Sequence, residues 1–472
     1  MDRTRYQSPF SSRYTSDRMQ YLFSEEFKFR TWRRLWIALA EAEQELGLPV
    51  TDAQLAELRR FADDINYEVA EAKEREIRHD VMSHVHAYAV QAPEGGKILH
   101  LGATSCYVGD NTDLIIMREA LTLVLGKLHK VIANLAAFAA RHRELATLGF
   151  THYQPAQLTT VGKRACLWLQ DFTTDFEELL RRRDTLKARG VKGTTGTQAS
   201  FMNLFANDSA KVRELDRRVS EKMGFAASFP VTGQTYPRKT DALIVASLAS
   251  LAQSAHRFAT DLRLLSNLRE LEEPFEQKQV GSSAMAYKRN PMRSERICSL
   301  ARYLIAQNEN PAYTASVQWL ERTLDDSANR RLCLAESFLA ADAILILLDN
   351  VTDGLIVNPA MVKKHVDQEL PFMATENLLM EGSKRGESRQ ELHEVIRGHS
   401  HAAAAALKAG GDNNLLDLLA EDPRFPLDRA AIDAVIAAGR FTGRAAEQVD
   451  EFLGEQVHPL LERHAALADR KS

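Results

Sequence analysis

The sequence has 472 residues, with 60 Lys and Arg against 64 Asp and Glu and a formal net charge of −4. A charge so near zero argues against nucleic acid or an anionic membrane as the main partner, because both attract cationic surfaces. With 45% hydrophobic and 26% charged residues, the composition excludes disordered and collagen-like chains, and the scarcity of Gly (23) and Pro (14) disfavours an all-β architecture.

Helical periodicity begins close to the N-terminus. Six apolar residues at helical spacing predict a first helix that ends at Gly47 and Pro49: Phe29, Trp32, Leu35, Trp36, Leu39 and Leu46. Thr51 and Gln54 then have the spacing of a capping box, in which two side chains bind the free backbone amides at a helix start. Residues 22–76 are therefore expected to form short helices.

A strict heptad runs through residues 111–142. Leucine occupies one position (Leu114, Leu121, Leu128, Leu135), and Met117, Val124, Val131 and Phe138 occupy the other. Such a stripe predicts a helix packed lengthwise in a left-handed bundle. Four further long helices are predicted at about 158–189, 241–271, 292–307 and 328–350. One chain does not readily bury every stripe on rods this long, so a homo-oligomer is expected.

The predicted fold is all-α, with a long central helical bundle and smaller helical N- and C-terminal domains. The expected domains are 1–110, 111–358 as the oligomer core, and 359–472, where the helical pattern shortens again. The longest weakly polar stretch, 242–255, is too short and too polar to span a bilayer. The N-terminal residues lack the apolar core of a secretory signal, and the four widely spaced cysteines fit free thiols, so a cytoplasmic location is expected.

Four segments have no helical period: 95–111, 150–157, 190–198 and 272–291. Long irregular segments in a regular helical protein usually bind ligands or carry catalysis. The last contains GSSAMAYKRN from Gly281 to Asn290, where backbone amides and hydroxyls can wrap a carboxylate while Lys288 supplies charge. A solvated linker between two helices is the alternative.

Two further motifs contain histidine. His152 lies at a break between helices, where it can transfer a proton, although a lone histidine is more often structural. Arg78 and His79 suit a phosphate or carboxylate, with a polar surface turn as the alternative. His84 and His86 are two residues apart and point to different faces of a helix, which disfavours a metal site.

Hydroxyls and arginines gather before the helix predicted at 328–350. Arg322, Ser327 and Arg331, with Asp326 and Arg330, stand at its start, and this combination at a helix N-terminus suits a phosphate. A helix cap with surface arginines is the alternative. The glycine turns at 102–105 and 193–198 match neither a P-loop nor a dinucleotide fingerprint, but they can still form anion-binding nests.

In chain order, these motifs resemble the adenylosuccinate lyases, a branch of the fumarase/aspartase superfamily. Gly281 to Pro291 is similar to the superfamily signature GSSxMxxKxNP, which is highly specific. Six other segments are similar to the adenylosuccinate branch: 78–80, 101–110, 151–158, 192–200, 299–302 and 316–331. The similarity runs from about Tyr6 to beyond Asn377. Ala286 departs from it, standing where the family usually carries a proline, and this change is expected to loosen the loop.

The resemblance implies a fumarase/aspartase-like fold and a β-elimination that releases fumarate from adenylosuccinate and from the succinyl-carboxamide ribotide of purine synthesis. By similarity, Ser282 is the base and His152 the acid, with Lys288 favouring the serine alkoxide. Ser283 is the rival base, since the sequence alone does not separate adjacent serines. The resemblance implies no metal and no organic cofactor.

The resemblance also implies how the substrate is bound. Thr104, Ser105, Gln234, Lys288 and Asn290 would hold the succinyl carboxylates. Arg13, Tyr14, Arg322, Ser327 and Arg331 would hold the phosphate, His79 and Asp80 would face the base or ribose, and Arg78 and Arg296 also belong to the family's binding pattern. In the superfamily such sites are built from three subunits of a homotetramer.

Two other functions are compatible with the bundle. A sister lyase would act on argininosuccinate, malate or aspartate, but these substrates carry no phosphate for the cluster around Arg322. A helical scaffold without activity is the other, and a pure scaffold has no physical need for Ser282, Lys288 and His152 together.

Overall fold

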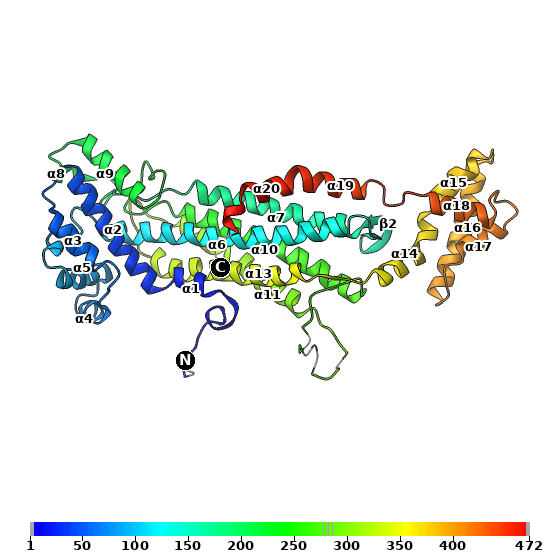
Figure 1. Cartoon of the computed structure of the whole chain (residues 1–472), viewed down its shortest axis with the longest axis horizontal. Helices are drawn as coiled ribbons and strands as arrows, with labels where there is room; N and C mark the ends of the chain where they lie inside the picture. Colours follow the sequence, from blue (N-terminus) through cyan, green and yellow to red (C-terminus); the bar gives the residue numbers. More distant parts are fainter. Residues whose placement is uncertain (1–3, 277, 280, 282, 286, 469–472) are drawn as a thin grey trace.

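The computed structural model describes residues 4–276, 278–279, 281, 283–285 and 287–468. This part of the chain forms an elongated rod of helices with a smaller helical unit at each end (Figure 1). The predicted all-α fold class is confirmed, since the only strands among the described residues are four short ones in two antiparallel pairs.

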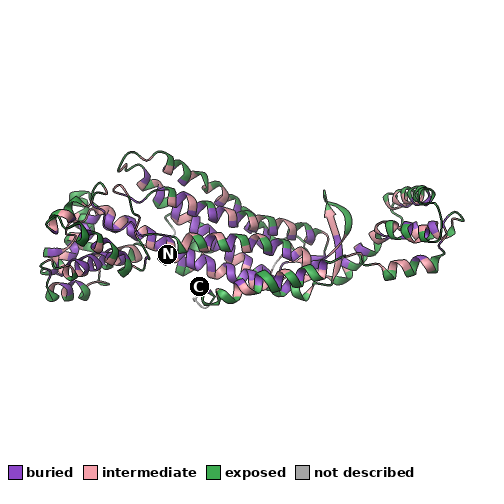
Figure 2. Ribbon diagram, turned by 90° about the horizontal axis from the view of Figure 1, so that it is seen from above, coloured by how far each residue is buried: buried purple, intermediate pink, exposed green. Residues whose placement is uncertain are grey.

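The rod is a bundle of five long helices. These are α6 (Ser105–Arg141), α7 (Val161–Asp184), α10 (Lys239–Asn267), α11 (Met292–Gln307) and α13 (Asp326–Asp353). Both heptad stripes of α6 are buried in one continuous core shared with the other four helices, and Figure 2 shows the buried residues along the inner faces of the bundle. The predicted lengthwise packing of this helix is therefore confirmed. Each of the five helices lies where the sequence places it, within a few residues.

The unit at one end is built on α2 (Glu25–Glu45), α3 (Asp52–Arg60), α4 (Tyr67–Ile77), α5 (Asp80–Gln91) and the 3-10 turn Gly95–Ile98. The capping box at the start of α3 is confirmed, with Gln54 N donating to Thr51 Oγ1 at 3.2 Å and Thr51 N to Gln54 Oε1 at 2.9 Å. Its core also takes in α8 (Ala199–Leu204) and α9 (Ser209–Lys222), whose Phe201 and Leu215 are fully buried there. Residues 199–222, predicted to belong to the central domain, therefore pack on the first unit.

The unit at the other end contains α15 (Thr375–Lys384), α16 (Arg389–Lys408), α17 (Leu415–Glu421) and α18 (Arg429–Ala438), joined to the bundle by α14 (Pro359–Met373). It has its own apolar core. The chain then returns along the rod as α19 (Ala445–Phe452), the π-turn Leu453–Val457, α20 (His458–Arg463) and the 3-10 turn Ala465–Leu467. Val449 and Val457 of this return segment are buried in the central core. The predicted C-terminal domain, 359–472, therefore divides between two cores.

The remaining elements are short. The π-turn Phe10–Tyr14 and α1 (Asp17–Leu22) precede α2, and α12 (Glu309–Ser316) precedes α13. Strands β1 (Ala146–Thr151) and β2 (Gln154–Thr160) form a hairpin, and β3 (Leu271–Glu272) pairs with β4 (Ile356–Val357). By length and composition alone α6 is apolar enough to cross a membrane, unlike segment 242–255, but 61% of its most apolar window is buried in the bundle.

One carboxyl group is buried without a partner in the core of the first unit. Glu43 of α2 is 0% exposed, and neither carboxylate oxygen accepts a hydrogen bond from any residue that the structure describes. Burial raises the pKa of Glu43 to about 9, because an unpaired charge is costly in an apolar surrounding. The folded protein therefore keeps this group protonated at neutral pH, while the unfolded chain releases the proton near pH 4.5.

This difference predicts a pH-dependent loss of stability. Because the Glu43 pKa is raised on folding, the stabilisation is complete below about pH 4.5 and is lost as the pH rises toward 9. We expect Glu43→Gln to flatten this decline and to raise stability at pH 8–9 by about 1–3 kcal/mol. The measurement is denaturant unfolding at pH 5, 7 and 9, with Glu26→Gln on the exposed face of α2 as the control. A decline of the same slope in Glu43→Gln would contradict the prediction.

Candidate functional site

Predicted binding residues from α5, α6 and α13 meet where the first unit joins the bundle. His79 caps the start of α5: its Nδ1 accepts the Met82 amide at 3.3 Å, and its Nε2 lies 3.4 Å from Ser105 Oγ. Asp80, the first residue of α5, lies 3.6 Å from the guanidinium of Arg331 on α13. The starts of α5 and α6 thus lie side by side, and helix N-termini favour anions.

Gln234 joins the same group from the loop before α10. Its Oε1 accepts a hydrogen bond from the Cys106 thiol, with a sulfur to oxygen distance of 3.4 Å. Its Nε2 donates a hydrogen bond to Thr194 O at 3.0 Å. Burial raises the pKa of the Cys106 thiol to about 11, so the thiol keeps the proton that it donates. Thr104 is the N-cap residue of α6, although its side chain makes no capping hydrogen bond. The glycine turn at 193–198 therefore does contribute to this site, through Thr194.

The arginine cluster predicted before residue 328 lies at the first turn of α13, which begins at Asp326. Arg322 Nη1 donates to both Asp326 oxygens, at 3.1 and 3.2 Å, and the Ser327 amide donates to Leu324 O at 3.1 Å. Glu321 O accepts a hydrogen bond from the backbone N–H of Gln234 at 2.9 Å, which ties the Arg322 loop to the loop before α10. Hydroxyl, amide and cationic groups thus converge here from five separate segments of the chain.

Arg78 ends α4 beside this group. It has left-handed backbone geometry, with φ of +55°, as the C-cap residue directly before His79. This conformation lets α4 stop and α5 start without a longer connection. The arginine that the sequence pairs with His79 is therefore held next to it by the backbone.

A second group contains Arg13, Tyr14 and Arg296. The Arg296 guanidinium of α11 stands 5.5 Å from the centre of the Tyr14 ring, and that of Arg13 stands 5.9 Å from it. Cation–π contacts of this kind gather two cations around one aromatic ring. No hydrogen bond or ion pair described for these three residues connects them to the group around Arg322.

The signature loop leaves the bundle between β3 and α11 (Figure 1). Asn290 Nδ2 donates to Gly281 O at 2.9 Å, and Lys288 N donates to Met285 O at 3.0 Å. A Cβ atom on Gly281 would lie 2.1 Å from Lys288 O, so only glycine allows this close approach. Ser282, the predicted base, and Ala286 lie outside the described residues.

His152 occupies the tip of the β1–β2 hairpin. His152 and Tyr153 are the two central residues between the paired Thr151 and Gln154, and both have positive φ, of 52° and 58°. This is the geometry of a tight two-residue hairpin turn. The break between helices predicted here is thus a hairpin, and it lies at the end of the rod far from α2–α5 (Figure 1). One chain therefore keeps His152 apart from the group around Arg322.

Sequence reasoning missed two residues beside the site, the half-buried His100 and the buried Arg189. His100 Nδ1 accepts the Trp36 indole N–H at 2.9 Å, and burial lowers the His100 pKa to about 4, so the ring stays neutral. Arg189 is fully buried and donates to the backbone carbonyls of Gly193, at 2.8 Å, and Gln234, at 2.8 and 3.0 Å. A cation directly before the irregular segment 190–198 was the available signal for Arg189.

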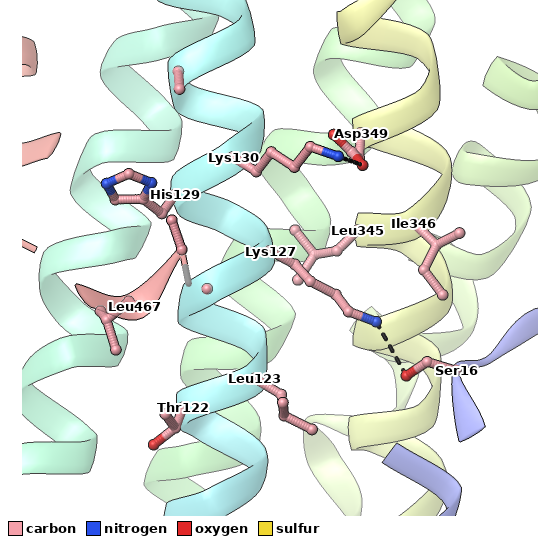
Figure 3. Close-up of a pocket in the computed structure, with 13 residues that line it drawn as sticks. Ser16, Thr122, Leu123, Lys127, His129, Lys130, Leu345, Ile346, Asp349 and Leu467 are labelled. Carbon is pink, nitrogen blue, oxygen red and sulfur yellow. Dashed lines mark hydrogen bonds and ion pairs between the residues drawn. The ribbon is translucent and has the colours of Figure 1, made fainter. Parts of the chain in front are cut away.

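A cavity of about 650 Å³ lies elsewhere, between α6, α13 and the end of the return segment (Figure 3). Its cations are already neutralised. Lys130 lies 2.7 Å from Asp349, while Lys127 pairs with Asp342 at 2.5 Å and donates to Ser16 Oγ at 3.1 Å. None of the predicted site residues that the structure describes lines this cavity, so we do not assign the substrate to it.

Family models and known proteins that match this chain are named as lyases or adenylosuccinate lyases. A family model described as lyase matches residues 12–305, and one described as adenylosuccinate lyase C-terminus matches residues 371–452. The adenylosuccinate lyase of Schizosaccharomyces pombe is 50% identical over 97% of this chain and 95% of its own length. That of Saccharomyces cerevisiae is also 50% identical, over 98% of this chain and 96% of its own.

The fold is shared with more distant lyases. The crystal structure of fumarate lyase from Mesorhizobium sp. BNC1 aligns with a TM-score of 0.80 at 23% identity, covering 96% of this chain and all of that one. That of 3-carboxy-cis,cis-muconate lactonizing enzyme from Pseudomonas putida aligns at 0.81 and 20%, covering 96% and 99%. At these identities the likeness shows the fold alone. The full-length relatives and the family models are decisive: the chain belongs to the adenylosuccinate lyase family.

Proposed function

We propose that this protein is an adenylosuccinate lyase of purine nucleotide biosynthesis. It cleaves a carbon–nitrogen bond by β-elimination, releasing fumarate from adenylosuccinate to leave AMP, and from the succinyl-carboxamide ribotide (SAICAR) to leave AICAR. The observation that carries the proposal is the group of Arg322, Arg331, Ser105 and Gln234, which provides guanidinium, hydroxyl and amide donors at adjoining helix starts. Such donors suit a substrate that combines a phosphate with carboxylates.

The reaction needs a base, an acid and cations. The base removes the proton beside a carboxylate, the electron pair forms the carbon–carbon double bond, and the acid protonates the departing nitrogen. We assign the base to Ser282 and the acid to His152, the roles that family resemblance gives them. Lys288 stabilises both the serine alkoxide and the doubly charged carboxylate that forms during the elimination. None of these steps requires a metal or an organic cofactor.

We further propose a homotetramer whose active sites are shared between subunits. Within one chain, His152 lies at the opposite end of the rod from α2–α5 and the group around Arg322. Packing rods of different subunits lengthwise would bring the hairpin of one subunit to the helix starts of another. A near-neutral protein with free thiols at its four cysteines fits a cytoplasmic enzyme with a small nucleotide substrate, and not a nucleic-acid or membrane partner.

Fumarate release by the purified protein tests the activity directly. Adenylosuccinate and argininosuccinate are offered in parallel, and formation of fumarate is followed by its ultraviolet absorbance. We expect release from adenylosuccinate only, because argininosuccinate has no phosphate for the arginine cluster. Release from argininosuccinate would overturn the substrate assignment, and no release from either would favour another sister lyase or an inactive scaffold.

Replacing single serines identifies the base. We expect Ser282→Ala to lower kcat by about 10²–10⁴-fold, the usual contribution of a general base, while adenylosuccinate still binds. Ser283→Ala, one residue away, is the matched control and should retain most activity. Steady-state kinetics of both variants, with binding measured by calorimetry, separate the two serines. The opposite pattern would move the base to Ser283.

Mixing two inactive variants tests the shared sites. His152→Ala and Ser282→Ala tetramers are combined, dissociated and allowed to exchange subunits. If each site takes these residues from different subunits, about a quarter of the sites in random mixed tetramers regain both, so activity should return to roughly that level. Native mass spectrometry confirms the exchange. Mixed tetramers without any recovered activity would refute the sharing of sites.

A further inference from the structure

A buried arginine links three helices beneath the Arg322 group. Arg238, directly before α10, has a side chain only 2% exposed. It donates to Asp110 of α6 at 3.1 and 3.2 Å and to Asp326 of α13 at 2.6 Å. Buried carboxylates require such partners, because an unpaired charge in the interior is strongly destabilising. Arg238 therefore fixes the start of α13 against α6 and α10.

Asp326 is shared between this interior arginine and the surface. Its side chain is 0% exposed, and it also accepts both hydrogen bonds from Nη1 of Arg322, whose side chain is 22% exposed. Arg322 Nε and Nη2 bond no residue that the structure describes. One guanidinium nitrogen is thus anchored inside the protein while two remain available for a ligand.

The backbone around Arg322 is tied through Glu321 O, but the side chains that precede Arg322 in this segment are largely exposed. Leu320, two residues earlier, is 97% exposed and has a positive φ of 47°, and Trp319 is 72% exposed. An arginine on such a segment would lose much side-chain entropy when it binds a ligand, unless another group already holds it. The ion pair with Asp326 provides this hold before the substrate arrives.

We propose that Asp326, itself held by Arg238, is a positioning residue that orients the Arg322 guanidinium toward the substrate phosphate. This inference rests on the proposed function, since it assumes that Arg322 binds that phosphate. It predicts a selective effect: loss of Asp326 weakens recognition of the phosphate and leaves the elimination step itself unchanged. If Asp326 were merely structural, its loss would weaken the binding of all substrates alike.

The same network contains a matched control. Asp241 of α10 is 1% exposed and pairs with the buried Arg330 at 2.7 Å, and it accepts the Tyr236 hydroxyl at 2.6 Å. It therefore resembles Asp326 in burial and in having an arginine partner. None of the hydrogen bonds or ion pairs described for Asp241 reaches Arg322 or another residue assigned to the substrate.

The experiment compares Asp326→Asn and Asp241→Asn on two substrates, adenylosuccinate and its 5′-dephosphorylated nucleoside. For Asp326→Asn we expect KM for adenylosuccinate to rise about tenfold with kcat within about twofold of wild type, and kcat/KM for the nucleoside to stay within about twofold. Asp241→Asn should lower the thermal unfolding midpoint about as much as Asp326→Asn does. It should leave the ratio of kcat/KM values for the two substrates unchanged. Equal losses on both substrates in Asp326→Asn would overturn the proposal.

A double-mutant cycle shows whether Asp326 acts through Arg322. In an Arg322→Ala background, Asp326→Asn should raise KM for adenylosuccinate no further, since the group that it orients is gone. Additive effects would contradict the proposal. If Asp326→Asn does not fold, Asp326→Glu keeps the charge but moves the carboxylate by one methylene, and the same selective rise in KM is expected; unchanged KM would count against it.

The proposed function and the role of Asp326 are tested by different measurements. Turnover of adenylosuccinate by the wild-type protein tests the activity, and the variants test the role of Asp326. If the wild type shows no turnover, the proposed function fails, and calorimetry with AMP and adenosine still tests the inference. Asp326→Asn should then weaken AMP binding about tenfold and adenosine binding by less than twofold; equal effects on both ligands would refute it.

Discussion

Lengthwise packing of long helices is the constraint on which the rest of this structure depends. A helix of 37 residues such as α6 spans about 55 Å at 1.5 Å per residue, and its apolar stripes stay buried only when neighbouring rods run beside it for most of that length. The residues that we assign to the proposed site accordingly lie near helix ends and in the loops that leave the rod. The hairpin with His152, the loop with Lys288 and the helix starts around Arg322 all obey this rule.

At this end of the bundle, buried ion pairs connect the helices in the interior. Asp110, Asp326 and Asp241 are each nearly or fully buried, and two buried arginines, Arg238 and Arg330, bind them. Burial alone would lower the pKa of Arg238, yet the surrounding carboxylates raise it overall, so the guanidinium remains charged. The apolar core sets how the rods lie side by side, while this network sets the register at which their ends meet.

Much of this could be predicted from the sequence, because heptads and caps are local signals. The stripe from Leu114 to Leu135 and the capping box at Thr51 each depend on residues within a few turns. Contacts between distant parts of the chain left no such local signal. The hairpin around His152 consists of two short strands of mixed polarity. Helix α9 is amphipathic, and its apolar face would fit the core of the first unit or that of the bundle. The placement of Gln234 beside Cys106, 128 residues away, required the structure.

The return of α19 and α20 along the rod changes how the far unit is connected. The chain leaves the bundle after β4 and comes back at Ala445, so α15–α18 form an insertion held by two tethers at the same end of the rod. A body held at two points turns freely only about the line through them, whereas one on a single linker can reorient in every direction. This double attachment therefore restricts how the unit can turn relative to the rod more than a single linker would.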